Sequence, residues 1–151
     1  MASAWETFSS GDLPKPIRPL LSEALKSLTG AIGKRSVAKT RQAAIETARW
    51  SFDLQLRHRP VIEINLARFD LWAAQVMVDA AAKDTGSVTG DMFTLTLIRD
   101  RILAKLDADT AQSLNIQLGE LMTASADGEF DAASAAAGKL REIVAAMKPA
   151  P

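Results

Sequence analysis

Residues 65–82, NLARFDLWAAQVMVDAAA, have the composition of an α-helix and contain neither Gly nor Pro. When successive residues are placed about 100° apart, as in an α-helix, apolar side chains cover most of the circumference. The main apolar face consists of Leu66, Phe69, Ala73, Val76, Met77 and Ala80. The remaining polar stripe is narrow and consists of Arg68, Trp72, Gln75 and Asp79. A helix that is apolar on most sides is usually covered by several neighbours, so we predict that this is the central helix.

The composition of the whole chain also favours helices. Of its 151 residues, 48% are hydrophobic, which is typical of a folded globule rather than a disordered chain. Tyr is absent, β-branched residues are sparse and Ala is abundant, and these features favour helix over sheet. The absence of Cys excludes disulfides, thiolate metal sites, iron–sulfur clusters and cysteine nucleophiles.

Hydrophobic spacings of three and four residues predict further helices around the central one. In chain order, the six predicted helices cover about residues 16–32, 36–58, 65–82, 87–106, 109–126 and 130–148. Turns that contain Gly33, Gly86 and Gly128 separate the two helices of each successive pair. Because short connections join antiparallel neighbours, we predict an all-α fold, a six-helix bundle built from three antiparallel helical hairpins.

The expected domain organisation is simple. Residues 1–15 are expected to form a flexible arm, attached through Trp5 and Phe8, and residues 16–148 a single helical-bundle domain. No apolar run reaches the roughly 18 residues of a membrane span. The first residues fit a native cytoplasmic terminus and also fit a trimmed periplasmic or secreted protein, so the compartment stays open.

Several polar residues are expected to cap helices. Ser36 precedes the second helix, and either Asp107 or Asp109 precedes the fifth. Asn65 is a good N-cap for the central helix, although that helix could also begin directly after Pro60.

Two segments carry a second interpretation. Residues 92–98, MFTLTLI, alternate in polarity like a strand, but the helical spacing on both sides favours a helix. The last helix has an Ala-rich heptad seam that would permit close approach of another helix, which favours self-association. The seam consists of Phe130, Ala133, Ala137, Leu140, Val144 and Met147.

Charge is distributed unevenly although the formal net charge is zero. Residues 1–60 contain ten Lys or Arg and five Asp or Glu, a net charge of +5, whereas residues 61–151 carry −5. The two halves either complement each other inside one fold or leave a basic surface for an anionic partner. A nucleic-acid partner is not favoured, because the basic group at Lys34, Arg35, Lys39 and Arg41 matches no nucleic-acid-binding motif.

No catalytic constellation is present in the sequence. Neither of the glycine-rich phosphate-binding motifs, G-x-x-x-x-G-K and G-x-G-x-x-G, occurs in the sequence. The G-x-S-x-G motif of serine hydrolases is also absent. The single His excludes two-His metal sites within one chain. We therefore predict a protein that is not an enzyme and has no metal or cofactor.

His58 lies between Arg57 and Arg59, where it could ligate a haem or metal, bind an anion, or simply form a solvated basic helix end.

Two polar stripes with the same spacing are the most informative pattern. Each has one Trp and charges of both signs, at positions i, i+4, i+7 and i+11. The stripes either face each other as a polar seam that sets helix register, or line a binding cleft, since Trp and Arg often anchor interfaces. The stripes are Glu46, Trp50, Asp53 and Arg57 on the second helix, and Arg68, Trp72, Gln75 and Asp79 on the third.

The functional hypothesis follows from these patterns. We predict a helical binding domain that acts through a helix face, with a protein partner or a second copy of the chain. The alternative is a small-molecule or cofactor carrier with a pocket between helices near Trp50 and Trp72. The candidate binding residues are Trp50, Asp53, Arg57, His58, Arg68, Trp72 and Asp79.

Overall fold

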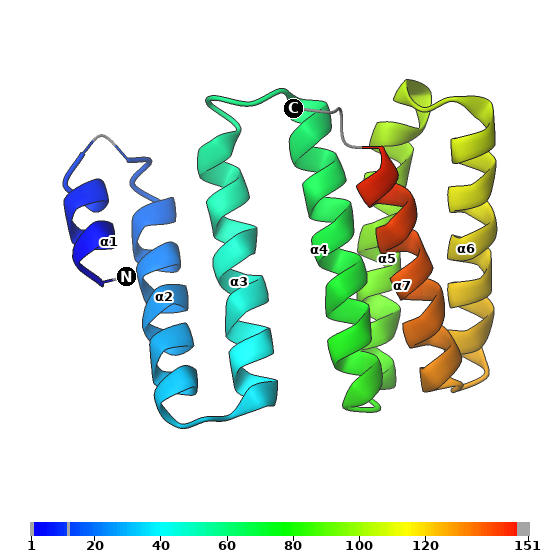
Figure 1. The fold of residues 1–151 in the computed structure, drawn as a ribbon, viewed down its shortest axis with the longest axis horizontal. Coiled ribbons are helices and arrows are strands. Elements are labelled where there is room, and N and C mark those ends of the chain that lie inside the picture. The colour runs from blue at the N-terminus through cyan, green and yellow to red at the C-terminus, as the bar shows by residue number, and fades with distance from the viewer. Residues whose placement is uncertain (1, 12, 148–151) are drawn as a thin grey trace. The chain divides into compact units, whose positions relative to one another are not determined.

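The computed structural model describes residues 2–11 and 13–147, and these residues form α-helices with no strand (Figure 1). The predicted all-α class is confirmed, and residues 92–98 are helical rather than extended. The helices are α1 (Ala2–Ser9), α2 (Ile17–Gly33), α3 (Val37–Gln55), α4 (Val61–Ala81), α5 (Thr85–Ile102), α6 (Ala108–Ala126) and α7 (Phe130–Ala146). A 3₁₀ turn, η1 (Leu103–Lys105), follows α5.

The chain divides into two compact units, which are described separately. Unit 1 is Met1–Arg59 and unit 2 is Pro60–Pro151. The predicted single domain at 16–148 therefore stays a prediction. Within the described residues, no helix is both long and apolar enough to cross a membrane.

Unit 1 consists of α1, α2 and α3. The two long helices α2 and α3 lie side by side and run in opposite directions (Figure 1). Within the predicted arm, residues 2–9 form α1, and the indole Nε1 of Trp5 donates a hydrogen bond of 3.0 Å to Oγ of Ser22 on α2. A helix of only eight residues is marginal in isolation, so this attachment to α2 helps to hold it.

The core of unit 1 is thin and agrees with the apolar stripes of the sequence only in part. Its buried apolar residues are Leu21, Ala24, Ala31 and Ala43, and the first two lie on the stripe that the spacing predicts for α2. Four other residues of the predicted stripes are exposed, namely Leu20, Ile32, Ala44 and Leu56. The physical reason is that two packed helices bury only one narrow stripe each, and small side chains occupy that stripe here.

Unit 2 has a larger core centred on α4. This helix packs against both α5 and α7, and α6 packs against α7. Phe69, Ala73 and Val76 are fully buried, and Met77 is partly buried against the same core. The apolar face predicted for α4 is therefore covered by helices of unit 2.

The Ala-rich seam of α7 faces this core. Ala133, Ala137, Leu140 and Val144 are all 0% exposed, because α4 and α6 pack against α7. The sequence suggested that this seam could join two copies of the chain. The structure corrects that suggestion, since the seam is already covered within one chain.

Helix ends match the predictions only in part. Helix α4 begins at Val61, so Asn65 is a buried residue inside the helix and not its N-cap. Helix α3 ends at Gln55, three residues before the predicted end. Asp107 caps α6 as expected, since its Oδ1 accepts a 2.9 Å hydrogen bond from the Thr110 backbone N–H. Asp84 plays the same role for α5, at 3.0 Å from the Ser87 nitrogen, and was not predicted.

Candidate functional site

A groove runs along unit 1 between α2 and α3, with a volume of about 810 Å³. Its lining on the α2 side runs from Pro19 to Lys34, the C-cap of α2, and the fourteen helical rises from Leu20 to Lys34 correspond to about 21 Å. Because α2 and α3 run in opposite directions, Lys39 at the start of α3 lies near the Lys34 end, and Trp50 lies near the Leu20 end. The groove therefore has an apolar end and a basic end.

The floor of the groove is made of small residues. Ala24, Ala31 and Ala43 are buried where the two helices meet, and Ser27 and Gly30 are exposed above them. No atom lies within 4 Å of the position that a Cβ would take on Gly30. Since no large side chain fills this space, another helix or chain segment could approach the backbone of α2 closely.

The apolar end of the groove carries an aromatic and a guanidinium group. The guanidinium carbon of Arg49 lies 5.4 Å from the centroid of the Trp50 ring, which is within the range of a cation–π contact. Nη1 of Arg49 is also 3.4 Å from Oε1 of Glu46, and Glu46 lines the groove.

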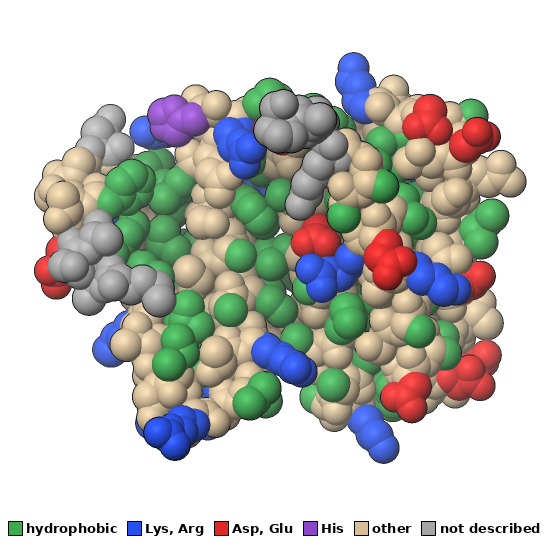
Figure 2. Space-filling view, in the orientation of Figure 1, with side chains coloured by type: hydrophobic (Ala, Val, Ile, Leu, Met, Phe, Trp, Pro, Cys, Tyr) green, Lys and Arg blue, Asp and Glu red, His purple; other side chains and the backbone are tan. Residues whose placement is uncertain are grey.

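The other end of the groove is basic. Lys34 and Lys39 line its rim and are exposed, while Lys26 and Glu23, which are also exposed lining residues, lie nearer to Leu20. Figure 2 shows Lys and Arg side chains at the turn between α2 and α3. In that turn Arg35 adopts a positive φ of 51°, a conformation that usually favours Gly, and its side chain is exposed. The +5 net charge of residues 1–59 is thus partly concentrated here.

Only one of the site residues predicted in unit 1 lines this groove, namely Trp50. Asp53 lies in the last turn of α3 and is partly buried. Arg57 and His58 follow the end of α3 and are exposed. The His58 backbone N–H donates a 2.9 Å hydrogen bond to the Gln55 carbonyl oxygen, which forms a turn directly after the helix. These features describe a solvated helix end.

The three site residues predicted in unit 2 lie on α4. Trp72 is partly buried and packs against the core, and Arg68 is also partly buried. Asp79 accepts a 2.7 Å hydrogen bond from Nε2 of Gln75, so these two members of the predicted stripe are in direct contact. That the stripes of α3 and α4 face each other stays a prediction.

A buried carboxyl group, Asp91 of α5, which interacts with the partly buried Asp79 of α4, was not predicted from the sequence. Asp91 of α5 is only 5% exposed, and its Oδ2 accepts no hydrogen bond from the described residues. Burial raises the pKa of Asp91 to about 8, and a hydrogen bond with Asp79 and the charges of Asp79 and Asp84 act in the same direction. A protonated Asp91 has a hydrogen to donate to Asp79, whereas an ionised one has none. We conclude that Asp91 holds its proton at neutral pH.

The signal for this residue was present in the sequence. Asp91 falls on the same stripe as the buried residues Val88, Leu95 and Ile98, at the helical spacing of three and four. An Asp on a core-facing stripe must be neutral or paired when it is buried. The pair has only two carboxyl groups, and among residues 2–11 and 13–147 no three His, Asp or Glu side chains come together as metal ligands.

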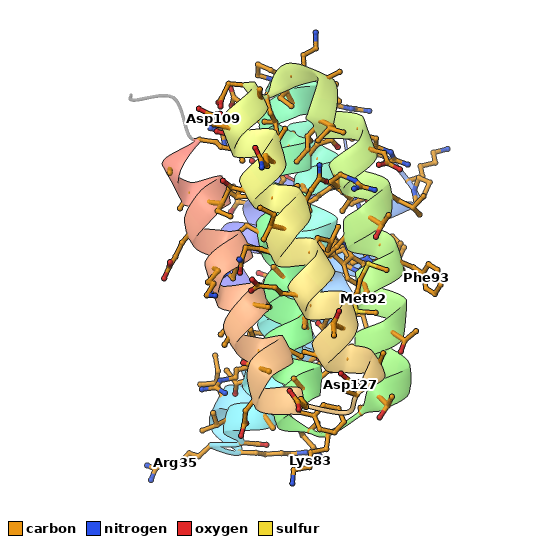
Figure 3. The ribbon with its side chains drawn as sticks, turned by 90° about the vertical axis from the view of Figure 1, so that its right-hand side faces the viewer. Arg35, Lys83, Met92, Phe93, Asp109 and Asp127 are labelled. Carbon is orange, nitrogen blue, oxygen red and sulfur yellow. The ribbon has the colours of Figure 1, made fainter. Side chains whose placement is uncertain are left out.

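A second cavity, of about 640 Å³, lies within unit 2 where α4 begins and α7 ends. Its apolar wall includes Ile62, Leu66 and Ile143, and its rim carries charged groups such as Lys105 and Asp109. Figure 3 shows Asp109 at the start of α6. Neither Trp50 nor Trp72 lines this cavity, so it differs from the pocket that the sequence suggested.

Asp70 of α4 pairs with Arg141 of α7. Nε of Arg141 donates to Oδ1 of Asp70 at 2.9 Å, and Nη2 donates to Oδ2 at 3.4 Å. The pair joins two helices that are distant in sequence, and both side chains are partly exposed. This pairing explains Asp70 as a structural residue of unit 2.

Comparison with protein-family models, with curated proteins and with solved structures gives no match to this chain.

Proposed function

We propose that this protein is a non-enzymatic binding domain that acts through a helical surface, the α2–α3 groove. The single observation that supports it most is the groove itself, which is open, about 810 Å³ in volume and floored by small residues. Trp50 and Arg49 at one end belong to the residue types that most often anchor protein interfaces. The proposal keeps the helix-face hypothesis and moves it from the α3–α4 stripes to the opposing faces of α2 and α3.

A protein partner fits this groove better than a small ligand does. The groove extends for about 21 Å, which matches roughly four turns of a helix laid along it. Recognition of a helix in a groove uses side chains spaced along several turns, and it needs no closed cavity. In the arrangement that we propose, the six long helices pair as three antiparallel hairpins, and the α2–α3 hairpin carries the binding surface.

Site-specific cross-linking in the source cell tests this function. A photo-reactive amino acid at Ser27, an exposed position of the groove, should give one reproducible cross-linked protein. Gly30→Trp should remove that product, because the indole would occupy the groove where a Cβ meets no atom within 4 Å. Gly119→Trp is the matched control, since Gly119 is also an exposed helical Gly with free space around a Cβ but lies on α6.

The purified cross-linked partner should then bind the wild-type chain and the Gly119→Trp variant equally in a calorimetric titration, and Gly30→Trp should bind at least ten-fold more weakly. Equal binding by all three proteins would contradict the proposal, as would cross-linking that Gly30→Trp leaves unchanged.

The cavity of unit 2 supports a second candidate function, a small-molecule carrier. Its volume of about 640 Å³ lies inside the range of roughly 300–1,000 Å³ that is usual for such sites. The apolar wall would suit an apolar molecule, and a rim with Glu63, Asp107 and Asp109 against Lys105 would suit a cationic rather than an anionic group on it. Native mass spectrometry of the full chain would show the bound mass, and Ser113→Trp, at an exposed position of the wall, should remove it. A chain that carries no added mass from the source cell argues against the carrier.

A further inference from the structure

We infer that the occupant of the α2–α3 groove is an acidic amphipathic helix of a partner protein. This inference rests on the proposed function and specifies its partner. Two observations carry it, the small-residue floor and the charges on the rim.

The floor selects for a helix with small or medium apolar residues on one face. Ala24, Ala31 and Ala43 keep α2 and α3 close together, and Ser27 and Gly30 leave the space above them open. A helix can approach such a surface closely, because no large side chain holds its backbone away. The larger apolar residues of the partner would contact Leu20 and Trp50 at the other end.

The rim selects for negative charge on the flanks of that helix. Three lysines, Lys26, Lys34 and Lys39, line the groove. Two carboxylates, Glu23 and Glu46, share this lining, so the three lysines leave an excess of one positive charge, and Glu46 also has Arg49 at 3.4 Å. Lysine stems can lie along an apolar partner while the ammonium groups reach its acidic flanks. Complementary charge of this kind mainly sets specificity and association rate.

A synthetic probe tests the inference even while the natural partner is unidentified. The probe is a fluorescein-labelled helical peptide of about 20 residues, long enough to form a helix, with Ala and Leu on one face and Glu on both flanks. A matched peptide carries Lys in place of every Glu. A labelled 20-nucleotide single-stranded DNA serves as an anionic probe without a helix. Fluorescence anisotropy measures the binding of each probe to the full chain.

The acidic peptide should bind about ten-fold more tightly than the Lys peptide at low salt, and the difference should shrink as salt screens the rim charges. The triple variant K26E/K34E/K39E should reverse this preference. Gly30→Trp should abolish binding of the acidic peptide, whereas Gly119→Trp should leave it unchanged. Circular dichroism of each variant checks that the helices are retained.

Other outcomes overturn the inference in distinguishable ways. Equal binding of both peptides, lost in Gly30→Trp, would show a groove that takes helices without regard to charge, and the proposed function would stand. Tighter binding of the DNA, lost in the triple variant, would assign the rim to nucleic acid instead. Absence of binding by the acidic peptide, or binding that Gly30→Trp leaves intact, would reject this occupant, and the cross-linking experiment would then decide the proposed function separately.

Discussion

Replacing Asp91 by Asn should change how the stability of the protein depends on pH. The carboxyl group is buried between α4 and α5, and its pKa is raised from 3.8 to about 8 in the folded protein. Asn has nearly the same shape, remains neutral at every pH, and its amide can still donate a hydrogen bond to Asp79. The D91N variant therefore mimics the neutral, protonated form of Asp91 at every pH.

The sign follows from proton linkage. Between pH 3.8 and about 8 the folded chain holds a proton on Asp91 that the unfolded chain has lost. The stability that this group contributes is fully present below pH 3.8 and is lost as the pH rises through the folded pKa. Each pH unit in this window corresponds to about 1.4 kcal/mol. From pH 5 to pH 8 the wild-type protein should therefore lose about 3 to 4 kcal/mol that D91N does not lose.

Urea denaturation followed by far-UV circular dichroism at pH 5, 6, 7 and 8 measures this difference. Subtraction of the wild-type free energy of unfolding from that of D91N cancels the other titrating groups. Asp107→Asn is the matched control, because its exposed carboxylate caps α6 and hydrogen bonds from Thr110 lower its pKa, so that it titrates below this window. A D91N difference that stays constant from pH 5 to pH 8 would refute the assignment of a proton to Asp91.

Three further predictions concern the helices of unit 2. Gly119→Ala should stabilise the protein by about 0.5 to 1 kcal/mol, because a Cβ at this helical position contacts no other atom. Gly128→Ala should destabilise the protein by about 1 kcal/mol, because the backbone φ of Gly128 is +72°. Urea denaturation of both variants compares the two effects, and equal effects would contradict the reasoning. Arg141→Ala should cost about 1 kcal/mol at low salt and less at high salt, as it leaves Asp70 without its bidentate partner, and a cost independent of salt would argue against an ionic contribution. Ala137→Glu should destabilise unit 2 by more than about 3 kcal/mol, which thermal denaturation would show; a stable, folded A137E would mean that the α7 seam is not in the core.

The sequence was most informative about where helices form. Apolar residues at spacings of three and four marked α4 and α7, and their predicted faces are buried in unit 2. For the start of α4 the sequence left two positions open, because Asn65 has the chemistry of an N-cap and Pro60 can precede a first turn. The second alternative is confirmed, since the helix begins directly after Pro60, and this start places Ile64, which is 1% exposed, inside the helix.

The features of the candidate site depend on contacts between helices, which the periodicity of one helix does not specify. The spacing predicted a core-facing stripe on α2 that includes Leu20, Ala24 and Ile32, but only Ala24 of these three is buried, together with Leu21 and Ala31. The residues buried between α2 and α3 are therefore mostly Ala, and the groove lies above them. The position of Asp91 on a core-facing stripe was readable from the sequence, whereas its protonation depends on Asp79 from another helix.

Helix α5 shows that periodicity can also identify the buried side. Val88, Leu95 and Ile98, at helical spacings of three and four, form the buried side, and α5 packs against α4. Phe93 is 70% exposed and points away from the neighbouring helices (Figure 3). Leu97, one turn later, is also exposed.

Chemical-shift mapping of the isotopically labelled chain with the unlabelled acidic peptide tests the groove most directly. The account predicts that the largest shifts fall on the backbone amides of Ser27 and Gly30 and on the indole N–H of Trp50, while the resonances of α6 stay in place. Shifts centred on the unit 2 cavity around Ser113 and Lys105, with the groove unaffected, would contradict it.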